Sequence, residues 1–156
     1  MRKKILQVIL CLAIPQIAGL IGSVFTTTQI STWYAGLIRP SIAPPNWIFG
    51  PVWIFLFLLM GIALIPIVKS KMKHKEIAYI VFGTQLVLNI FWSIFFFALH
   101  SPALALFEII FLWFAILMNI LIFFKINKWS GILLIPYFLW VSFASVLNYF
   151  FWILNK

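Results

Sequence analysis

Four side chains able to form hydrogen bonds recur at regular intervals within one apolar stretch, 77–99, of this 156-residue chain. They stand at the spacing i, i+4, i+7 and i+8 and are Gln85, Asn89, Trp92 and Ser93. In an α-helix this spacing places all four on one face. Amide, hydroxyl and indole groups form hydrogen bonds without carrying charge, and they are costly to leave unpaired in an apolar setting. The pattern therefore predicts a helix face that points into the protein and that can orient a bound molecule.

Two further apolar stretches carry aromatic and small side chains at helical spacing. In the stretch 47–68 they are Trp53, Phe57, Met60 and Gly61. In the stretch 130–154 they are Pro136, Trp140, Phe143, Ala144, Leu147 and Asn148. Three faces of this kind can enclose one cavity, in which aromatic walls stack on flat rings and one or two amides fix the orientation. The pattern predicts a site for a large, flat and mostly apolar ligand.

The same side chains also have a purely structural interpretation. An amide in a membrane helix often just binds a neighbouring helix, with a gain of about 1 kcal/mol. From the residues alone, both interpretations of Asn89 stay open. Trp113 has no polar companion on its face, so it is expected to pack or to face lipid. Three tryptophans near the borders of apolar stretches are typical of an interfacial belt, namely Trp47, Trp129 and Trp152.

Side chains that carry acid–base, nucleophilic or metal chemistry are scarce. Glu76 and Glu108 are the two acidic residues, there is no Asp, and Cys11 is the single cysteine. This inventory leaves little material for hydrolase chemistry, and it predicts neither a metal site nor an obligatory cofactor. Glu108 lies about two turns into the stretch 102–124, where an ionisable group faces the protein interior. We interpret it as a neutral or hydrogen-bonded structural carboxyl, with a role in transport as the alternative.

The composition decides which elements must position these side chains. Because 65% of the residues are apolar and 8% are charged, a water-soluble domain is excluded. A membrane-spanning helix needs about 20 mostly apolar residues, and unpaired backbone groups in hydrocarbon require the spans to be helical. The sequence predicts an all-α integral membrane protein, a five-transmembrane-helix bundle that forms a single domain over 1–156. The predicted spans are 5–25, 47–68, 77–99, 102–124 and 130–154.

Lys and Arg gather on one side of the predicted bundle. Nine of the eleven lie before the first span or in the loops 69–76 and 125–128, whereas Arg39 and Lys156 lie on the other side. The positive-inside rule places the amino terminus in the cytoplasm and the carboxyl terminus outside a cell membrane that the chain crosses several times. Basic residues confined to short loops and a tail do not form a nucleic-acid footprint, so no nucleic-acid partner is expected.

The connection 26–46 is too long for a simple turn between adjacent helices. Loops longer than about 12 to 15 residues in compact proteins are usually lids or disordered linkers. This connection contains Trp33, Tyr34 and the prolines Pro44 and Pro45, and disordered linkers are poor in aromatic residues. We therefore expect an ordered lid over the cavity.

Three motifs follow one another in a characteristic order between residues 33 and 148. They are WYAGLIRPSIAPPNWIFGPVW at 33–53, LNIFWS at 88–93 and PYFLWVSFASVLN at 136–148. In these motifs the chain resembles the tryptophan-rich sensory protein (TspO/MBR) family, also called the translocator protein or peripheral-type benzodiazepine receptor family. The resemblance implies a five-helix bundle in the lipid bilayer that forms a homodimer. It also implies a receptor for porphyrins and other tetrapyrroles and for isoquinoline and benzodiazepine-type ligands.

The resemblance also implies which residues contact the ligand. The family's motifs place its site tryptophans at Trp53 and Trp140, its asparagine at Asn89, and a small wall residue at Ala144, and helical spacing alone groups the same positions. The complete set of predicted ligand-binding residues is Trp33, Tyr34, Pro44, Trp53, Phe57, Asn89, Trp92, Ser93, Trp140, Phe143, Ala144 and Leu147.

Two functions remain open under this resemblance. The first is a binding protein for protoporphyrin IX or a haem-like tetrapyrrole that serves transport, sensing or scavenging. The second is light-dependent oxidative degradation of bound protoporphyrin, for which Trp33 and Trp140 match the implicated pocket tryptophans. Because no acid, base or metal site is evident, the first is the leading hypothesis. For the homodimer, small side chains of the first span are expected to form the contact face, namely Ala18, Gly19, Gly22 and Ser23.

Overall fold

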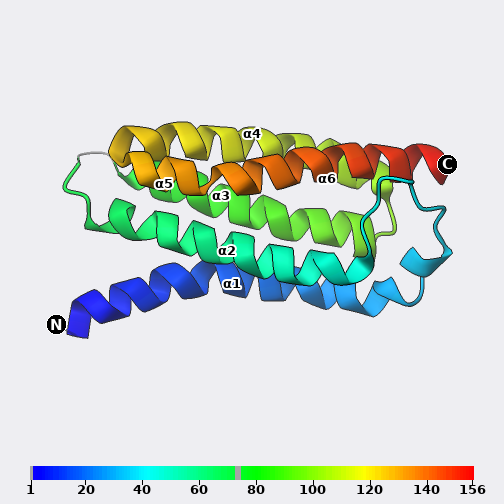
Figure 1. Cartoon of the computed structure of the whole chain (residues 1–156), viewed down its shortest axis with the longest axis horizontal. Helices are drawn as coiled ribbons and strands as arrows, with labels where there is room; N and C mark the ends of the chain where they lie inside the picture. Colours follow the sequence, from blue (N-terminus) through cyan, green and yellow to red (C-terminus); the bar gives the residue numbers. More distant parts are fainter. Residues whose placement is uncertain (1, 73–74) are drawn as a thin grey trace.

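The computed structural model describes residues 2–72 and 75–156, and these form no strand. Helices long and apolar enough to cross a membrane number five among the described residues. They lie side by side as a bundle with the two termini at opposite ends (Figure 1). The predicted all-α, five-span fold is therefore confirmed. The helical elements are α1 (Arg2–Ile30), η1 (Tyr34–Gly36), α2 (Asn46–Lys69), α3 (Glu76–Ser93), η2 (Ile94–Ala98), α4 (Pro102–Ile126), α5 (Lys128–Leu133) and α6 (Ile135–Leu154).

Helix α1 is longer than the predicted span 5–25 and ends at Ile30. Its last turns are polar, but Thr26 and Thr27 donate their hydroxyls to carbonyl oxygens four residues earlier, at 3.2 and 2.9 Å. These side chains satisfy their hydrogen bonds within the helix, so the helix continues through them. The connection to α2 is consequently 31–45, shorter than the predicted lid 26–46.

The third and fifth spans are each built from two pieces. After α3 the chain forms a wider π-helical turn, η2, in which the Leu99 amide donates to the Ile94 carbonyl at 2.9 Å. His100 then adopts a left-handed conformation with φ of 51°, which ends the helix. The predicted span 130–154 is divided at Leu134, because Pro136 lacks an N–H and is accommodated in the first turn of α6.

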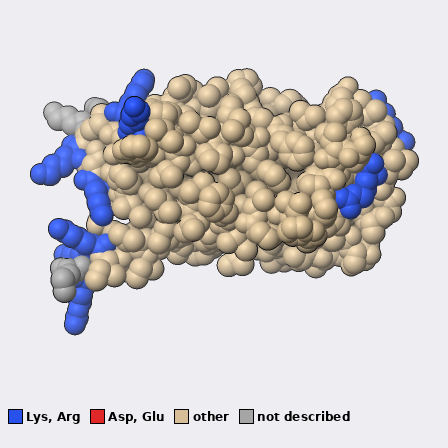
Figure 2. Space-filling model, in the orientation of Figure 1, with Lys and Arg blue, Asp and Glu red and all other residues tan. Residues whose placement is uncertain are grey.

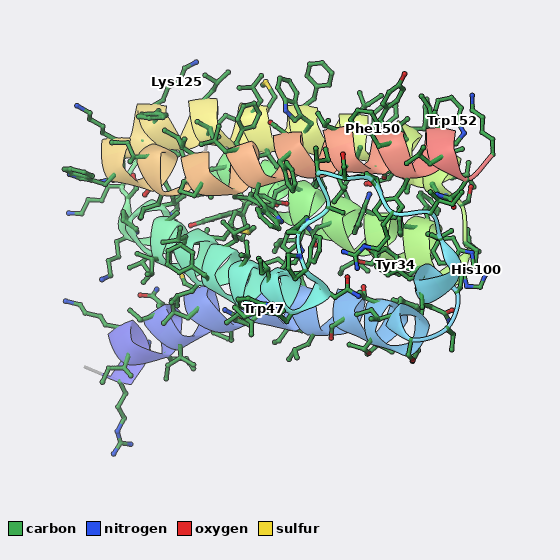
Figure 3. The ribbon with its side chains drawn as sticks, turned by 45° about the vertical axis from the view of Figure 1, so that its right-hand side comes forward. Tyr34, Trp47, His100, Lys125, Phe150 and Trp152 are labelled. Carbon is green, nitrogen blue, oxygen red and sulfur yellow. The ribbon has the colours of Figure 1, made fainter. Side chains whose placement is uncertain are left out.

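Basic side chains lie at the two ends of the bundle, and the surface between them carries none on the face shown (Figure 2). One end holds the start of α1 and the α2–α3 and α4–α5 connections. The other end holds the α1–α2 connection and the carboxyl terminus. Figure 3 labels Lys125 at the first end and Trp152 at the second. The chain is thus a multi-pass membrane protein. Lys73, which the sequence analysis counted among the basic residues of the loop 69–76, lies outside the described residues.

Small residues allow α1 to pack closely on α2 and α3. Ala18 and Gly22 are buried, a side chain on Gly19 would collide with the Phe57 ring, and one on Gly22 would lie 3.1 Å from the Ser93 hydroxyl. The predicted use of these residues as a dimer face is therefore wrong, because they face the interior of their own bundle and make room for side chains there. The homodimer itself stays a prediction.

The crossing of α1 and α2 at Gly61 predicts a sharp difference between two glycines. A Cβ at Gly61 would lie 2.8 Å from both the Cys11 carbonyl oxygen and the Leu12 Cα, whereas a Cβ at Gly83 on α3 meets nothing within 4 Å. Gly61→Ala should destabilise the protein by about 1–3 kcal/mol through overpacking. Gly83→Ala should instead stabilise it by about 0.5–1 kcal/mol, because alanine suits a helix better. Thermal unfolding in detergent measures both, and equal melting temperatures would contradict the close crossing.

Candidate ligand-binding site

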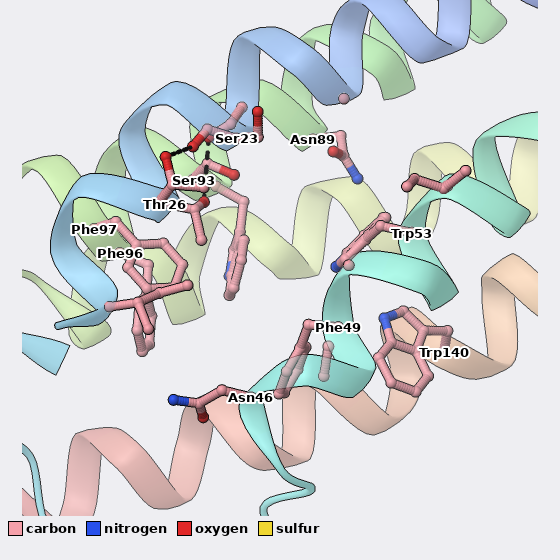
Figure 4. Close-up of a pocket in the computed structure, with 18 of the residues that line it drawn as sticks. Ser23, Thr26, Asn46, Phe49, Trp53, Asn89, Ser93, Phe96, Phe97 and Trp140 are labelled. Carbon is pink, nitrogen blue, oxygen red and sulfur yellow. Dashed lines mark hydrogen bonds between the residues drawn. The ribbon is translucent and has the colours of Figure 1, made fainter. Parts of the chain in front are cut away.

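A cavity of about 330 Å³ lies within the half of the bundle next to the α1–α2 connection. This volume is at the lower end of the range of about 300–1,000 Å³ that is usual for ligand pockets. Side chains from α1, α2, α3, η2 and α6 form its walls, and Tyr34 of η1 closes it from the connection (Figure 4). The described part of the chain thus contains an interior void of the kind that the aromatic stripes predict.

Aromatic rings supply most of the wall. Trp53 stacks on Phe57 with ring centroids 5.4 Å apart, and Trp92 stacks on Phe96 at 5.2 Å. Trp140 meets the edge of the Phe49 ring at 5.9 Å. Each indole is therefore held by a second ring behind or beside it, and such pairs add about 0.5–1.5 kcal/mol beyond the burial of their area. The walls are consequently preorganised to receive a flat apolar molecule.

Hydrogen bonds fix two of the polar wall residues. The Asn89 amide donates to the Tyr137 hydroxyl at 3.2 Å. The Trp92 indole donates to the side-chain oxygen of Asn148 at 3.0 Å, and the side-chain NH₂ of Asn148 donates to the Pro102 backbone carbonyl at 2.7 Å. Asn148 therefore ties α3 and the start of α4 to α6, and it sets the direction of the Trp92 ring.

Two other polar wall atoms have no hydrogen-bond partner among the described residues. They are the indole nitrogen of Trp140, a donor, and the side-chain oxygen of Asn46, an acceptor. A buried polar group without a partner costs about 1–3 kcal/mol. Both atoms have almost no accessible surface in the structure, so a bound molecule can relieve this cost only if the Trp140 and Asn46 side chains turn towards it.

Nine of the twelve predicted site residues line the cavity. Their contact with a ligand stays a prediction. The nine are Tyr34, Trp53, Phe57, Asn89, Trp92, Ser93, Trp140, Ala144 and Leu147.

The other three predicted residues, Trp33, Pro44 and Phe143, lie outside the cavity wall. Trp33 stacks on the His100 imidazole with ring centroids 4.6 Å apart, because consecutive residues of the short η1 turn point in different directions and Tyr34 takes the inward one. Pro44 contributes a backbone carbonyl to the connection. Phe143 sits at the edge of the inward stripe of α6 and packs beside the Trp140 ring at 5.7 Å.

The wall that α1 provides was missed by the sequence analysis. Gln16, Gly19, Ser23 and Thr26 line the cavity from this helix. Their spacing of i, i+3, i+7 and i+10 is a helical stripe of polar and small residues, and this signal could have identified them. It was obscured because the residues after Phe25 looked like the start of a loop. The start of α2 and η2 also contribute unpredicted residues, namely Asn46, Phe49, Gly50, Phe96 and Phe97.

Tyr34 packs the α1–α2 connection against the end of the cavity, and the ordered lid stays a prediction. Tyr34 is buried against Phe97 and Phe151, with ring centroids 5.7 and 5.3 Å away. Burial raises the pKa of the Tyr34 hydroxyl above its ordinary value, although the Arg39 cation nearby lowers it in part. The Arg39 guanidinium lies 5.9 Å from the Tyr34 ring centroid. Because burial outweighs this cation, Tyr34 lines the cavity as a neutral side chain.

Two polar side chains of α4 lie away from the cavity wall. Glu108 is buried, and neither carboxyl oxygen has a hydrogen-bond partner within the described ranges. Because a charge at membrane depth is costly without a partner, this geometry favours the neutral structural carboxyl. Trp113 packs against the Phe138 ring with centroids 4.7 Å apart, as expected, and its indole also donates to the Ser142 hydroxyl at 2.8 Å. That hydroxyl comes from α6, which the spacing along α4 alone did not reveal.

The double role of Asn148 predicts a large effect of its removal. Asn148→Leu leaves the Trp92 N–H without its acceptor and the Pro102 carbonyl without its donor, so we expect a loss of about 2–4 kcal/mol in stability. Ser145→Ala is the matched control on the same helix, because its hydroxyl donates only to the Val141 carbonyl one turn earlier. Thermal unfolding in detergent should separate the two variants clearly. Similar melting temperatures would show that the interhelical bonds of Asn148 contribute little.

Comparison with known proteins was consistent with this architecture along the whole chain. The TspO/MBR family model matches residues 11–153. The tryptophan-rich protein TspO of Chlorobaculum tepidum is 41% identical over 151 residues, which cover 96% of each chain. That of Archaeoglobus fulgidus is also 41% identical and covers 88% of this chain and 89% of its own. The translocator protein of Homo sapiens is 32% identical over 88% of this chain and 83% of its own.

These matches include the aromatic motifs of the α1–α2 connection, α3 and α6 that build the cavity. The chain belongs to the TspO/MBR family.

Proposed function

We propose that the protein is a membrane receptor or binding protein for porphyrins and related tetrapyrroles, which it holds in the cavity between α1, α2, α3 and α6. The observation that carries the proposal is an interior void walled by Trp53, Trp92 and Trp140 in a chain with few groups for other chemistry. A flat conjugated ring gains stacking energy against such walls. Isoquinoline and benzodiazepine-type molecules are smaller but also carry flat aromatic rings, so the same walls suit them.

The ring and the edge of a tetrapyrrole place different demands on the cavity. Its pyrrole N–H groups point to the centre of an apolar ring, and its carboxylates stand at the edge. The Trp140 N–H is a donor without a partner among the described residues, so it suits an acceptor at the edge of a ligand. Arg39, at the connection, adds a positive charge near the end of the cavity where a carboxylate would emerge. The ring therefore lies among the indoles, while its charged groups point towards the connection.

The name of one relative fits a role in sensing. A tryptophan-rich sensory protein of Cereibacter sphaeroides is 30% identical over 75% of this chain and 73% of its own. A binding protein that signals or hands on its ligand needs a cavity but no catalytic group, which agrees with the scarcity of acids and nucleophiles in this sequence. Sensing, transport and scavenging all begin with the same binding step.

We also propose that the amino terminus lies in the cytoplasm and the carboxyl terminus outside the cell membrane. Support comes from the excess of Lys and Arg at the end of the bundle that holds the amino terminus. Lys71→Cys and Lys156→Cys sit at opposite ends of the bundle, and buried Cys11 should not react. A membrane-impermeant maleimide added to intact cells should label the second variant and spare the first. The reverse pattern would invert the topology.

The binding proposal predicts a specific loss of affinity at Trp140. Titration of protoporphyrin IX should quench the intrinsic tryptophan fluorescence in a saturable way. Trp140→Ala removes a stacking surface and the free N–H donor, so we expect binding weakened by about tenfold or more. Trp129→Ala is the control, because Trp129 is exposed and lies outside the cavity wall. Equal affinity of both variants would count against this site.

Illumination of the same complex separates simple binding from degradation. A binding protein leaves the visible absorption of protoporphyrin to fade no faster than that of free protoporphyrin in detergent. Faster loss in the complex, slowed in Trp140→Phe, would instead support the light-dependent degradation that the family resemblance leaves open.

A further inference from the structure

The cavity reaches the surface of the bundle on one side. Its exposed wall residues are Leu20 and Thr27 on α1 and Gly50 and Ile54 on α2. Leu20 is 66% exposed and Ile54 is 62% exposed. The wall residues from α3, η2 and α6 are all buried or half-buried. The void is therefore open between α1 and α2, and we call this opening the α1–α2 mouth.

Two facing stripes border the mouth. On α1 the wall residues Gln16, Leu20, Ser23 and Thr27 follow helical spacing, and on α2 Asn46, Gly50 and Ile54 do the same. The Gln16 amide donates to the Ile54 carbonyl at 3.1 Å and joins the two stripes at their inner end. Because the helices run in opposite directions, Leu20 then lies across from Gly50. A glycine at this position leaves a gap, since a Cβ built on it meets nothing within 4 Å.

The position of the mouth in the bilayer follows from the helix rise. Ile54 is eight residues from the start of α2, which corresponds to about 12 Å along the axis. The mouth is therefore at the level of the acyl chains in the half of the bilayer next to the connection.

The hydroxyls at the mouth are compatible with hydrocarbon. Ser23 donates to the Leu20 carbonyl at 2.7 Å, and Thr27 donates to the Ser23 carbonyl at 2.9 Å. Figure 4 labels Ser23 and Thr26 on the α1 side of the cavity. Hydroxyls that bond within their own helix need no water, so an apolar molecule can pass them without exposing an unpaired donor.

At the aqueous end of the cavity, by contrast, hydrogen bonds hold the α1–α2 connection in place. The Asn155 side chain bonds both the amide and the carbonyl of Ile38, at 2.8 and 3.1 Å. The Arg39 guanidinium donates to the Pro44 carbonyl at 2.8 Å, and the His100 ring bonds Gln29 at 2.9 Å. Entry through the connection would break several of these contacts, whereas entry through the mouth breaks none of them.

We propose that the α1–α2 mouth is the portal of the cavity, and that its ligands are molecules dissolved in the hydrocarbon of the membrane, taken up sideways and not from water through the connection. The inference rests on the proposed function, since it assigns the route to the same binding site. It restricts the ligand class to apolar or amphiphilic molecules that partition into the bilayer.

Exchange rates in lipid nanodiscs test the route. Gly50→Phe places a ring in the mouth opposite Leu20, so the association and dissociation rates of protoporphyrin IX should both fall by about tenfold, whereas a mere loss of wall contacts would raise the dissociation rate. Gly83→Phe is the matched control, because a Cβ at Gly83 also meets nothing within 4 Å and this residue is outside the cavity wall. Unchanged rates in Gly50→Phe would overturn the proposal.

Crosslinking the connection tests the alternative entrance. Ile38→Cys and Asn155→Cys in a Cys11→Ala background can be joined by a bifunctional maleimide, which holds the connection shut. The proposal expects unchanged exchange rates after joining, and a strong slowing would place the entrance at the connection instead.

A measurement without porphyrin tests the portal independently of the proposed porphyrin binding. A nitroxide on Ser23→Cys should collide more often with membrane-dissolved oxygen than with a water-soluble nickel chelate. The opposite preference would show that the mouth faces water and would refute the portal. If this preference holds while protoporphyrin IX shows no saturable binding to the wild-type protein, the porphyrin assignment fails and the lipid-facing opening stands.

Discussion

Polar groups inside a membrane must find their partners within the protein, because hydrocarbon offers none. Asn148 meets this requirement for three helices at once, since it accepts from the Trp92 indole and donates to the Pro102 carbonyl. The cavity depends on this arrangement, for Trp92 forms part of its wall. Some polar groups stay unpaired among the described residues. The Trp140 N–H and the Asn46 oxygen belong to residues of the cavity wall, whereas the side-chain oxygens of Gln85, Glu108 and Asn119 belong to residues outside it.

A void inside such a bundle also needs room, and α1 provides it. Gly19 and Gly22 remove side chains at the points where Phe57 and Ser93 approach this helix. Close packing at Gly61, further along α2, holds the two helices together at the closed end. The same helix pair is therefore tight at one end and open at the other, so the opening is a product of the positions of small residues and not of loose packing. Some turns of α1 and α2 therefore stabilise the bundle, and other turns of the same two helices leave the cavity accessible.

Much of this architecture could be predicted from the sequence. Trp53, Asn89 and Trp140 were grouped by helical spacing alone, because each lies within a long helix whose inward face repeats every 3.6 residues. Spacing fails where no regular element exists, so the inward Tyr34 could not be distinguished from the adjacent Trp33, which stacks on a residue from a distant loop. The spacing of residues along one helix likewise does not show which side chains of other helices they contact. The bond from Trp113 to α6 and the cavity wall of α1 therefore required the three-dimensional structure.

The π-helical turn Ile94–Ala98 has a consequence for how this chain tolerates insertions and deletions. Such a turn accommodates one residue more than a regular helical turn. One more residue inserted there would exceed what the wide turn absorbs, and it would rotate everything that follows by about 100° relative to α3. His100 would then no longer stack on the Trp33 ring. Deletion of one residue would instead restore ordinary helical winding and leave the phase of the following residues nearly unchanged. This segment should therefore accept a shortened chain more readily than a lengthened one.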